Sequence, residues 1–74
     1  MSSSPSAAEI LLRPVDDLKV SVSTLSGLKA ANIYYVGDLV QRTETELREI
    51  GFSSTVVVEM RVALWSHGLD LTKD

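Results

Sequence analysis

Hydrophobic residues recur along this chain at the spacing of short α-helices rather than of strands. An apolar residue falls at every third position from residue 22 to residue 31, which predicts a helix whose apolar face consists of Val22, Leu25, Leu28 and, more loosely, Ala31. Ser21 or Ser23 is suited to cap the start of this helix. Gly27 weakens a helix relative to alanine, so we take it as the sign of a neighbouring backbone that approaches closely.

Two turns of the helix-hairpin-helix kind follow. The first is predicted over residues 33–39, where an apolar residue, a glycine, a polar residue and another apolar residue succeed one another and Gly37 supplies the tight turn. Thr43 and Glu46 have the spacing of a capping box at the start of a short helix, which Gly51 ends. Residues 50–53 predict the second turn, and a last helix then runs from about residue 54 to residue 67, where Gly68 ends it.

The two ends of the sequence are not predicted to form helices. Residues 1–8 consist of Ser, Pro and Ala after the initial Met, which is typical of a flexible tail or linker. Residues 9–18 are rich in apolar side chains, but Pro14 limits them to an extended segment or a short turn that straps across the helices. Leu69 and Leu71 are expected to fold back onto the core. The sequence therefore predicts one all-α domain over residues 9–74, a compact bundle of four to five short helices.

The last helix carries two apolar stripes. Val57, Met60 and Leu64 share one face and should belong to the core. A second stripe lies roughly 130° around the helix and consists of Thr55, Val58, Val62 and Trp65. A helix that is apolar on two sides is either buried twice or carries an interface. The second stripe is therefore a surface for protein binding or self-association, the place where the N-terminal strap or the C-terminal tail packs, or a scattered exposed surface without a role.

Composition and motifs exclude several classes of function. The protein has 74 residues, no cysteine, one histidine and a formal net charge of −3, with a sequence pI near 4.9. No nucleophile–base–acid set, phosphate-binding loop or metal-ligand spacing is present, so we expect neither an enzyme nor a cofactor or metal site. No apolar run approaches the roughly 18 residues of a membrane span and no signal peptide opens the chain, so a cytoplasmic protein without membrane contact is expected.

Residues 10–47 also carry a family resemblance. One segment reads Ile-Leu-Leu-Arg-Pro-Val-Asp-Asp-Leu from residue 10, and another reads Leu-Lys-Ala-Ala-Asn-Ile-Tyr-Tyr-Val-Gly-Asp-Leu-Val-Gln-Arg-Thr-Glu-Thr-Glu-Leu from residue 28. Both segments closely resemble the C-terminal domain of the alpha subunit of bacterial RNA polymerase. The resemblance extends to about residue 71. Beyond residue 47 it depends on apolar spacing, Glu59 and Leu69, with one residue deleted before Gly51.

The resemblance implies a DNA-binding surface whose contact residues have changed. In that family an arginine and an asparagine of the first helix and a Gly-Lys-Lys-Ser hairpin before the last helix hold DNA. The matching positions here are Ser23, Ser26, Ser53, Ser54, Thr55 and Val56. Lys29 matches a lysine of the same family surface. Serine is too short and uncharged to replace a minor-groove arginine, and the basic residues are scattered rather than clustered. We therefore expect DNA contacts that are weak or lost, with Ser53 and Ser54 otherwise serving to cap the last helix.

The resemblance also implies two protein-binding surfaces. The family touches the promoter-recognition (sigma) factor with Asp-Asp-Leu-Glu, which reads Asp16, Asp17, Leu18 and Lys19 here, so the last charge is reversed. Activators use a surface that corresponds to residues 43–46 and His67. Because Thr43 and Glu46 form a capping box whatever the partner, Glu44 and Thr45 are the better contact candidates. A lone histidine such as His67 is more typical of a helix cap than of a switch.

Three functions remain open. The first is a transcription-associated domain that acts through contacts with RNA polymerase or transcription-factor proteins and has lost most DNA contacts. The second is a working but weak DNA-binding domain, associated with the nucleoid, in which the hairpin amides and Lys29 hold phosphate. The third is a small scaffold that forms homo-oligomers through Val58, Val62 and Trp65.

Overall fold

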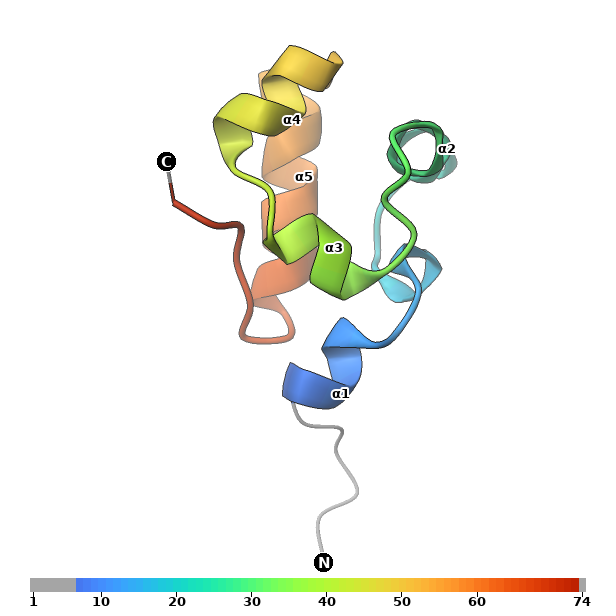
Figure 1. The fold of residues 1–74 in the computed structure, drawn as a ribbon, viewed down its shortest axis with the longest axis vertical. Coiled ribbons are helices and arrows are strands. Elements are labelled where there is room, and N and C mark those ends of the chain that lie inside the picture. Colours follow the sequence, from blue (N-terminus) through green and yellow to red (C-terminus); the bar gives the residue numbers. More distant parts are fainter. Residues whose placement is uncertain (1–6, 74) are drawn as a thin grey trace, which may run out of the picture.

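The computed structural model describes residues 7–73, and within them it contains five α-helices, one 3-10 helix and no strand (Figure 1). The elements in order along the sequence are α1 (Ala7–Leu11), η1 (Val15–Asp17), α2 (Val22–Ala30), α3 (Val36–Val40), α4 (Glu44–Ile50) and α5 (Ser54–Trp65). Two isolated β-bridges lie in the described residues, one between Pro14 and Tyr35 and one between Thr43 and Thr72. The predicted all-α fold is confirmed. No helix of the described region has the length and apolar character that crossing a membrane requires.

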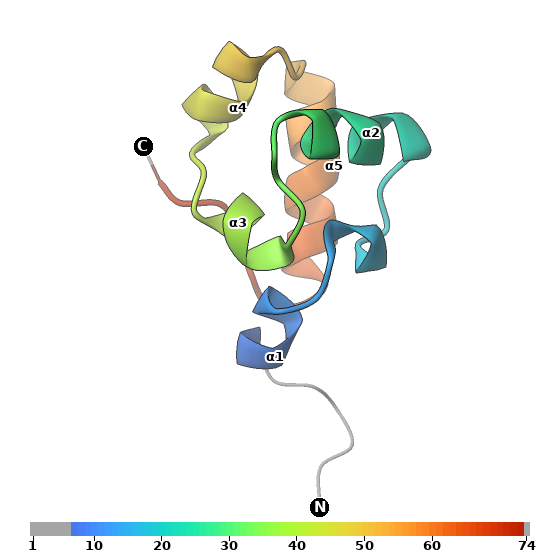
Figure 2. The same ribbon diagram turned by 45° about the vertical axis from the view of Figure 1, so that its right-hand side comes forward.

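The longest helix, α5, forms one side of the core, and the shorter helices pack around it. Figures 1 and 2 show α1 beside α3 at one end of the molecule and the turn between α4 and α5 at the other end. The predicted core positions of α5 are confirmed, since Val57, Met60 and Leu64 are fully buried. The helices η1, α2, α3 and α4 each contribute at least one fully buried side chain to the core. These side chains are Val15, Leu28, Val36, Leu39 and Leu47.

Three hydroxyl side chains fix where the longer helices begin. Ser21 caps α2 by accepting a hydrogen bond from the backbone N–H of Thr24. Thr43 caps α4 and completes the predicted capping box with Glu46. Ser53 caps α5 by accepting from the N–H of Val56. These bonds satisfy amides that the first turn of a helix leaves unpaired, so local side chains account for where α2, α4 and α5 begin.

The N-terminal region differs from its prediction. The flexible tail expected over residues 1–8 lies mostly outside the described residues, and its last two residues belong to α1. The strap expected over residues 9–18 as an extended segment or a short turn contains the end of α1, an extended Pro14 and the short 3-10 turn η1, so the helix α1 is the part that differs. Pro14 precedes η1 directly and has an extended backbone, with a φ of −68° that the proline ring fixes. Ile10, Val15 and Leu18 of this region are buried.

The buried face of α2 is rotated relative to the prediction. Thr24 and Leu28 are buried, whereas Val22 is largely exposed. A hydrogen bond from the Thr24 hydroxyl to Glu59 of α5 turns this side of the helix inward. The predicted apolar face is confirmed at Leu28, which is buried, and at Leu25 and Ala31, which pack against the core, and it is wrong at Val22.

Two glycines permit close contacts, although not the ones predicted. At Gly27 the close neighbour is a side chain rather than a backbone, because an added Cβ would lie 2.7 Å from Cε1 of Phe52. Gly37 lies inside α3 rather than at a turn, and an added Cβ there would lie 3.0 Å from the carbonyl oxygen of Leu11 in α1. The turn before α3 instead uses Asn32, whose φ is 64°, a conformation that asparagine tolerates better than most residues.

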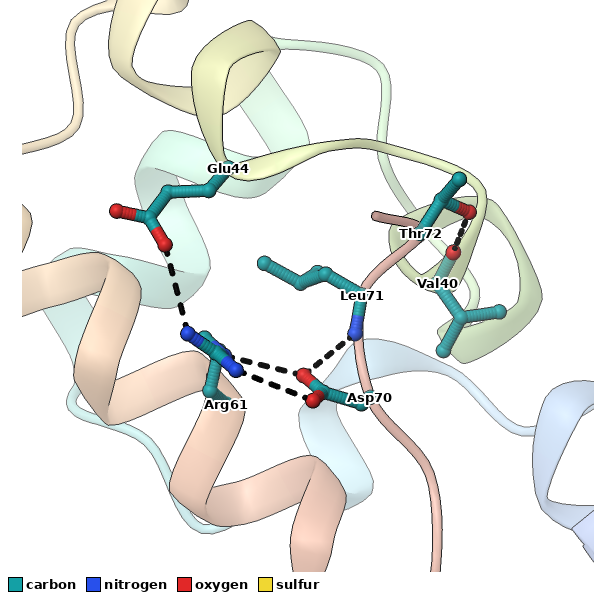
Figure 3. Close-up of polar contacts among 6 residues, drawn as sticks. All are labelled: Val40, Glu44, Arg61, Asp70, Leu71 and Thr72. Carbon is teal, nitrogen blue, oxygen red and sulfur yellow. Dashed lines mark hydrogen bonds and ion pairs between the residues drawn. The ribbon is translucent and has the colours of Figure 1, made fainter. Parts of the chain in front are cut away.

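The C-terminal segment returns along the bundle as expected. The helix α5 ends at Trp65, two residues before the predicted end, and Gly68 with a φ of 75° reverses the backbone. Leu71 is buried and Leu69 packs against the core. Thr72 then anchors the segment, because its hydroxyl donates to the carbonyl oxygen of Val40 and its backbone N–H donates to that of Arg42 (Figure 3).

Candidate DNA and protein interfaces

The N-terminus of α2 is occupied by a carboxylate of the same protein. The backbone N–H of Ser21 donates to Oε2 of Glu59 at 2.7 Å, and the Thr24 hydroxyl donates to Oε1 of Glu59 at 2.6 Å. These hydrogen bonds, first the one from Thr24, hold the pKa of Glu59 below its ordinary value. A negative charge at the start of a helix is favourable for folding, but it opposes the approach of a phosphate to the same place.

Ser23 and Ser26 lie exposed on α2, beside the start of α5. The contact of Gly27 with Phe52 joins α2 to the residue that precedes the α5 cap, and Thr24 joins it to Glu59 farther along α5. These two contacts bring α2 alongside residues 52–59. The structure therefore places the family's first-helix positions and its hairpin positions on neighbouring elements, as a shared binding surface requires.

The hairpin positions at the start of α5 carry no charge. Ser53, Ser54 and Thr55 are exposed, while the side chain of Val56 is half-buried against the core and its N–H is used by the Ser53 cap. A hollow of about 410 Å³ opens beside them and is lined by Thr45, Arg48, Glu49, Phe52, Ser53 and Ser54. Arg48 supplies the hollow with a positive charge, and Glu49 opposes it with a negative one.

Lys29 is paired with a carboxylate of the 3-10 helix. Its Nζ lies 2.8 Å from Oδ2 of Asp16, and both side chains remain a little under half exposed. The hydrogen bond from Lys29 lowers the pKa of Asp16. The neighbouring Asp17 pairs with Arg13 at 3.5 Å, and Lys19 is exposed. The candidate DNA contact Lys29 and the candidate sigma contact Asp16 therefore neutralise each other.

Arg61 of α5 connects the C-terminal segment with α4. Its guanidinium makes two hydrogen bonds to the Asp70 carboxylate, from Nε at 3.1 Å and from NH2 at 3.2 Å, and its NH1 lies 3.5 Å from Oε1 of Glu44 (Figure 3). The Arg61 guanidinium also lies 5.2 Å from the ring centre of Trp65. Hydrogen bonds, the largest from Arg61 and the next from Trp65, lower the pKa of Asp70 from 3.8 to about 2. One arginine thus fixes the C-terminal segment, the start of α4 and the indole of Trp65.

The second apolar stripe of α5 stays uncovered. Val58, Val62 and Trp65 are 54%, 53% and 51% exposed, and Thr55 is exposed as well. Within the described residues, neither the N-terminal strap nor the C-terminal tail buries the stripe, since its three apolar side chains remain about half exposed. The C-terminal segment reaches one end of the stripe, where hydrogen bonding by Trp65 is one cause of the lowered pKa of Asp70. Among the candidate activator contacts, Thr45 is exposed and Glu44 and His67 are half-buried.

Residues 2–63 match the family model for the C-terminal domain of the bacterial RNA polymerase alpha subunit. The match includes well over half of the sequence. The protein belongs to this family. The resemblance seen in the sequence is thereby confirmed, and so is the assignment to a transcription domain of the RNA polymerase alpha type.

Membership of the alpha C-terminal-domain family places this protein in a non-catalytic part of the polymerase. The family is a domain of the alpha subunit, and catalysis is not its role within the polymerase. In this member of the family, a carboxylate stands at the start of α2 and uncharged side chains stand at the start of α5.

The residues that shape this surface most strongly were not identified as site residues from the sequence. Glu59 was noted only as a family match, although it binds the start of α2 across 38 positions of the sequence. Arg61 and Asp70 were not singled out, because a pair nine positions apart beyond the end of a helix has no periodic signal. The spacing of Thr43 and Glu46, by contrast, gave a local signal that the structure confirms.

The substitution Asp70→Asn is expected to remove a small pH-dependent part of the stability. The folded pKa of Asp70 is lowered from 3.8 to about 2, so its contribution is present above about pH 4 and is lost as the pH falls through about 2. The loss should be small, because Arg61 and Asp70 are more than a third exposed and water screens the pair. Urea unfolding of both proteins between pH 5 and pH 2 measures it.

Asp38→Asn provides the control for this prediction, since Asp38 lies in α3 and outside the Arg61 network. The wild type and the control should lose stability more steeply than Asp70→Asn over this pH range. Equal losses in all three proteins would contradict the role assigned to the Arg61–Asp70 pair.

Proposed function

We propose that this member of the alpha C-terminal-domain family acts in transcription mainly through protein contacts, with DNA binding weak or absent. The observation that supports it most directly is the Glu59 carboxylate, which takes the amide and hydroxyl donors at the start of α2. Phosphate groups bind where helix N-termini and basic side chains are free to receive them. At α2 this place already holds a negative charge.

The charge distribution supports the same proposal. Lys29 is bound to Asp16, and the positions of the hairpin lysines hold Ser54 and Thr55. The whole protein has a net charge of −3. Affinity for duplex DNA comes largely from the counterions that basic side chains release, so an acidic domain without a basic cluster gains little from that source.

The proposed partners are RNA polymerase or transcription-factor proteins, and the proposed place of action is the bacterial cytoplasm. The Asp16–Asp17 surface, with Lys19 in place of an acidic residue, and the Glu44–Thr45 surface are the candidates that the family resemblance supplies. Both lie in exposed or half-exposed positions.

A second candidate function is weak binding of the DNA backbone at the start of α5. The hollow beside Ser53 and Ser54, with Arg48 in its wall, favours this alternative. Amides at a helix N-terminus attract phosphate even without lysines.

Fluorescence anisotropy with an A·T-rich duplex at several salt concentrations separates the two functions. A domain that binds DNA through several phosphates loses affinity steeply with salt, by a slope of about −0.9 per phosphate neutralised. We expect no saturable binding near physiological salt and, at low salt, a slope that corresponds to about one phosphate or less. A slope equivalent to several phosphates would favour the DNA-binding alternative and overturn the proposal.

A further inference from the structure

The outer face of α5 is apolar and carries no charge. With an advance of about 100° per residue, Thr55, Val58, Val62 and Trp65 fall within an arc of roughly 80° on this helix. We call this set the α5 stripe. Its three apolar members are each about half exposed, and no charged residue of α5 falls within the arc. A patch of this kind in a small domain is a frequent mark of a binding surface.

Trp65 is held in place before any partner arrives. The guanidinium of Arg61 lies over its ring at 5.2 Å, and hydrogen bonding by Trp65 is one of the causes that lower the pKa of Asp70. Asp70 is itself bound by Arg61 and by the N–H of Leu71. An aromatic side chain that is already ordered loses little entropy when it is buried, and tryptophan is a common centre of binding energy.

Carboxylates lie near both edges of the α5 stripe. On one edge, about 80° from the centre of the arc, lies Glu59, whose carboxylate binds α2. On the other edge lies Arg61, which pairs with the carboxylates of Asp70 and Glu44 (Figure 3), in a hollow that Lys73 also lines. The Glu59 edge is therefore acidic, whereas positive and negative charges are mixed at the Arg61 edge.

We propose that the α5 stripe docks the apolar face of an amphipathic helix whose flanking residues are basic, supplied by a different protein. A basic flank would lie against Glu59, the net charge of −3 would attract basic residues, and the apolar residues of the partner helix would cover Val58, Val62 and Trp65. This inference deepens and rests on the proposed function, in which the domain acts through protein contacts. It names a surface and a partner chemistry that the Asp16–Asp17 and Glu44–Thr45 surfaces do not supply.

A second copy of this protein fits the surface less well. In a two-fold antiparallel pair of helices that face each other, each edge meets the same edge of the other copy. Glu59 would then face Glu59, and like charges that face each other are unfavourable. A parallel pair would set Glu59 against the cluster of mixed charge around Arg61. Each copy has a net charge of −3, so charge favours a basic partner in either arrangement.

The contact should be weak because the stripe is small. Three half-exposed side chains offer roughly 300 Å² of apolar surface, against about 800 Å² per partner in a standard stable interface. The helix α5 has 12 residues and is about 18 Å long at 1.5 Å per residue. A peptide of about 14 residues therefore matches the length of the stripe.

Two synthetic peptides of about 14 residues test the inference with the 74-residue protein. Both form an amphipathic helix with the same Leu and Ala face, and they differ only in flanks of Lys or of Glu. The protein has a single tryptophan, so fluorescence reports Trp65 directly when the peptides lack tryptophan. We expect the Lys-flanked peptide to change the emission with a Kd below about 1 mM at low salt, and to bind at least tenfold more tightly than the Glu-flanked peptide.

Variants locate the contact. Val62→Ser should weaken binding of the Lys-flanked peptide about tenfold, whereas Leu12→Ser, which changes an exposed apolar residue outside α5, should leave it unchanged. Circular dichroism confirms that both variants fold. Sedimentation of the wild-type protein alone should give a monomer, and a dimer that Val62→Ser dissociates would assign the stripe to a second copy and overturn the inference.

Other outcomes also decide the matter. Absence of binding by the Lys-flanked peptide, equal binding of both peptides, or unchanged binding by Val62→Ser would each overturn the inference. These outcomes are distinct from failure of the proposed function, which is judged by the binding of duplex DNA and its salt dependence.

Discussion

A variant that regains three cations, Ser23→Arg with Ser54→Lys and Thr55→Lys, is expected to bind an A·T-rich duplex at least tenfold more tightly than the wild type. The three positions are exposed on α2 and at the start of α5, so the new side chains reach solvent without disturbing the core. The net charge rises from −3 to zero. Three added phosphate contacts should steepen the dependence of log K on log salt by about 2.7. Fluorescence anisotropy at several salt concentrations measures both quantities.

A charge-matched control shows whether position or total charge is responsible. Lysines at Ala8, Leu12 and Gln41 give the same net charge at exposed residues of α1, its C-terminal flank and the residue after α3. Figure 1 shows α1 at the opposite end of the molecule from the turn between α4 and α5, with α3 between them. The control should gain much less affinity. Equal gains in the two variants would mean that α2 and the start of α5 do not form a DNA surface.

Truncation of a buried leucine is expected to have the largest effect on folding. Leu64 of α5 is fully buried in the core, so Leu64→Ala should lower the free energy of unfolding by about 2–5 kcal/mol. A domain of this size has a total stability of only about 3–5 kcal/mol. Most of the variant should therefore be unfolded at 37 °C, as loss of helical circular dichroism and of a cooperative urea transition would show.

Leu12→Ala is the matched control, because the same atoms are removed from a side chain that is 79% exposed. It should change the free energy of unfolding by no more than about 0.5 kcal/mol. A similar loss in the two variants would contradict the core described here.

Local signals account for much of the fold. The capping box of Thr43 and Glu46, the stop at Gly51 and the buried positions of α5 follow from spacings of three or four residues. Such patterns lie within one helix and depend on hydrogen bonds or faces that the helix itself defines. The return of Leu71 to the core was also predictable, since it is an apolar residue directly after a helix stop.

Contacts between distant residues were not predictable in the same way. The bond between Thr24 and Glu59 joins residues 35 positions apart, and it decides which face of α2 is buried. The pairing of Lys29 with Asp16 depends on how η1 meets α2. Short spacings within a helix contain no information about either contact, which is why Val22 was placed in the core and Lys29 was treated as an available cation.

The prediction of an extended segment or a short turn over residues 9–18 missed the helix α1 for a different reason. Pro14 restricts the residues next to it, and this restriction was applied too far toward the N-terminus. Ala7–Leu11 lie far enough ahead of Pro14 to form a helical turn, which packs against Gly37 of α3.

NMR titration of the isotope-labelled protein with an A·T-rich duplex at low salt tests the central claim most directly. We expect no localised shifts at the amides of Ser23, Ser26, Lys29 and residues 53–56, because Glu59 takes the Ser21 amide and the Thr24 hydroxyl at the start of α2, Asp16 pairs with Lys29, and the start of α5 carries no charge. Saturable shifts confined to those amides would show that the surface still holds DNA, and would contradict the claim that this domain acts mainly through protein contacts.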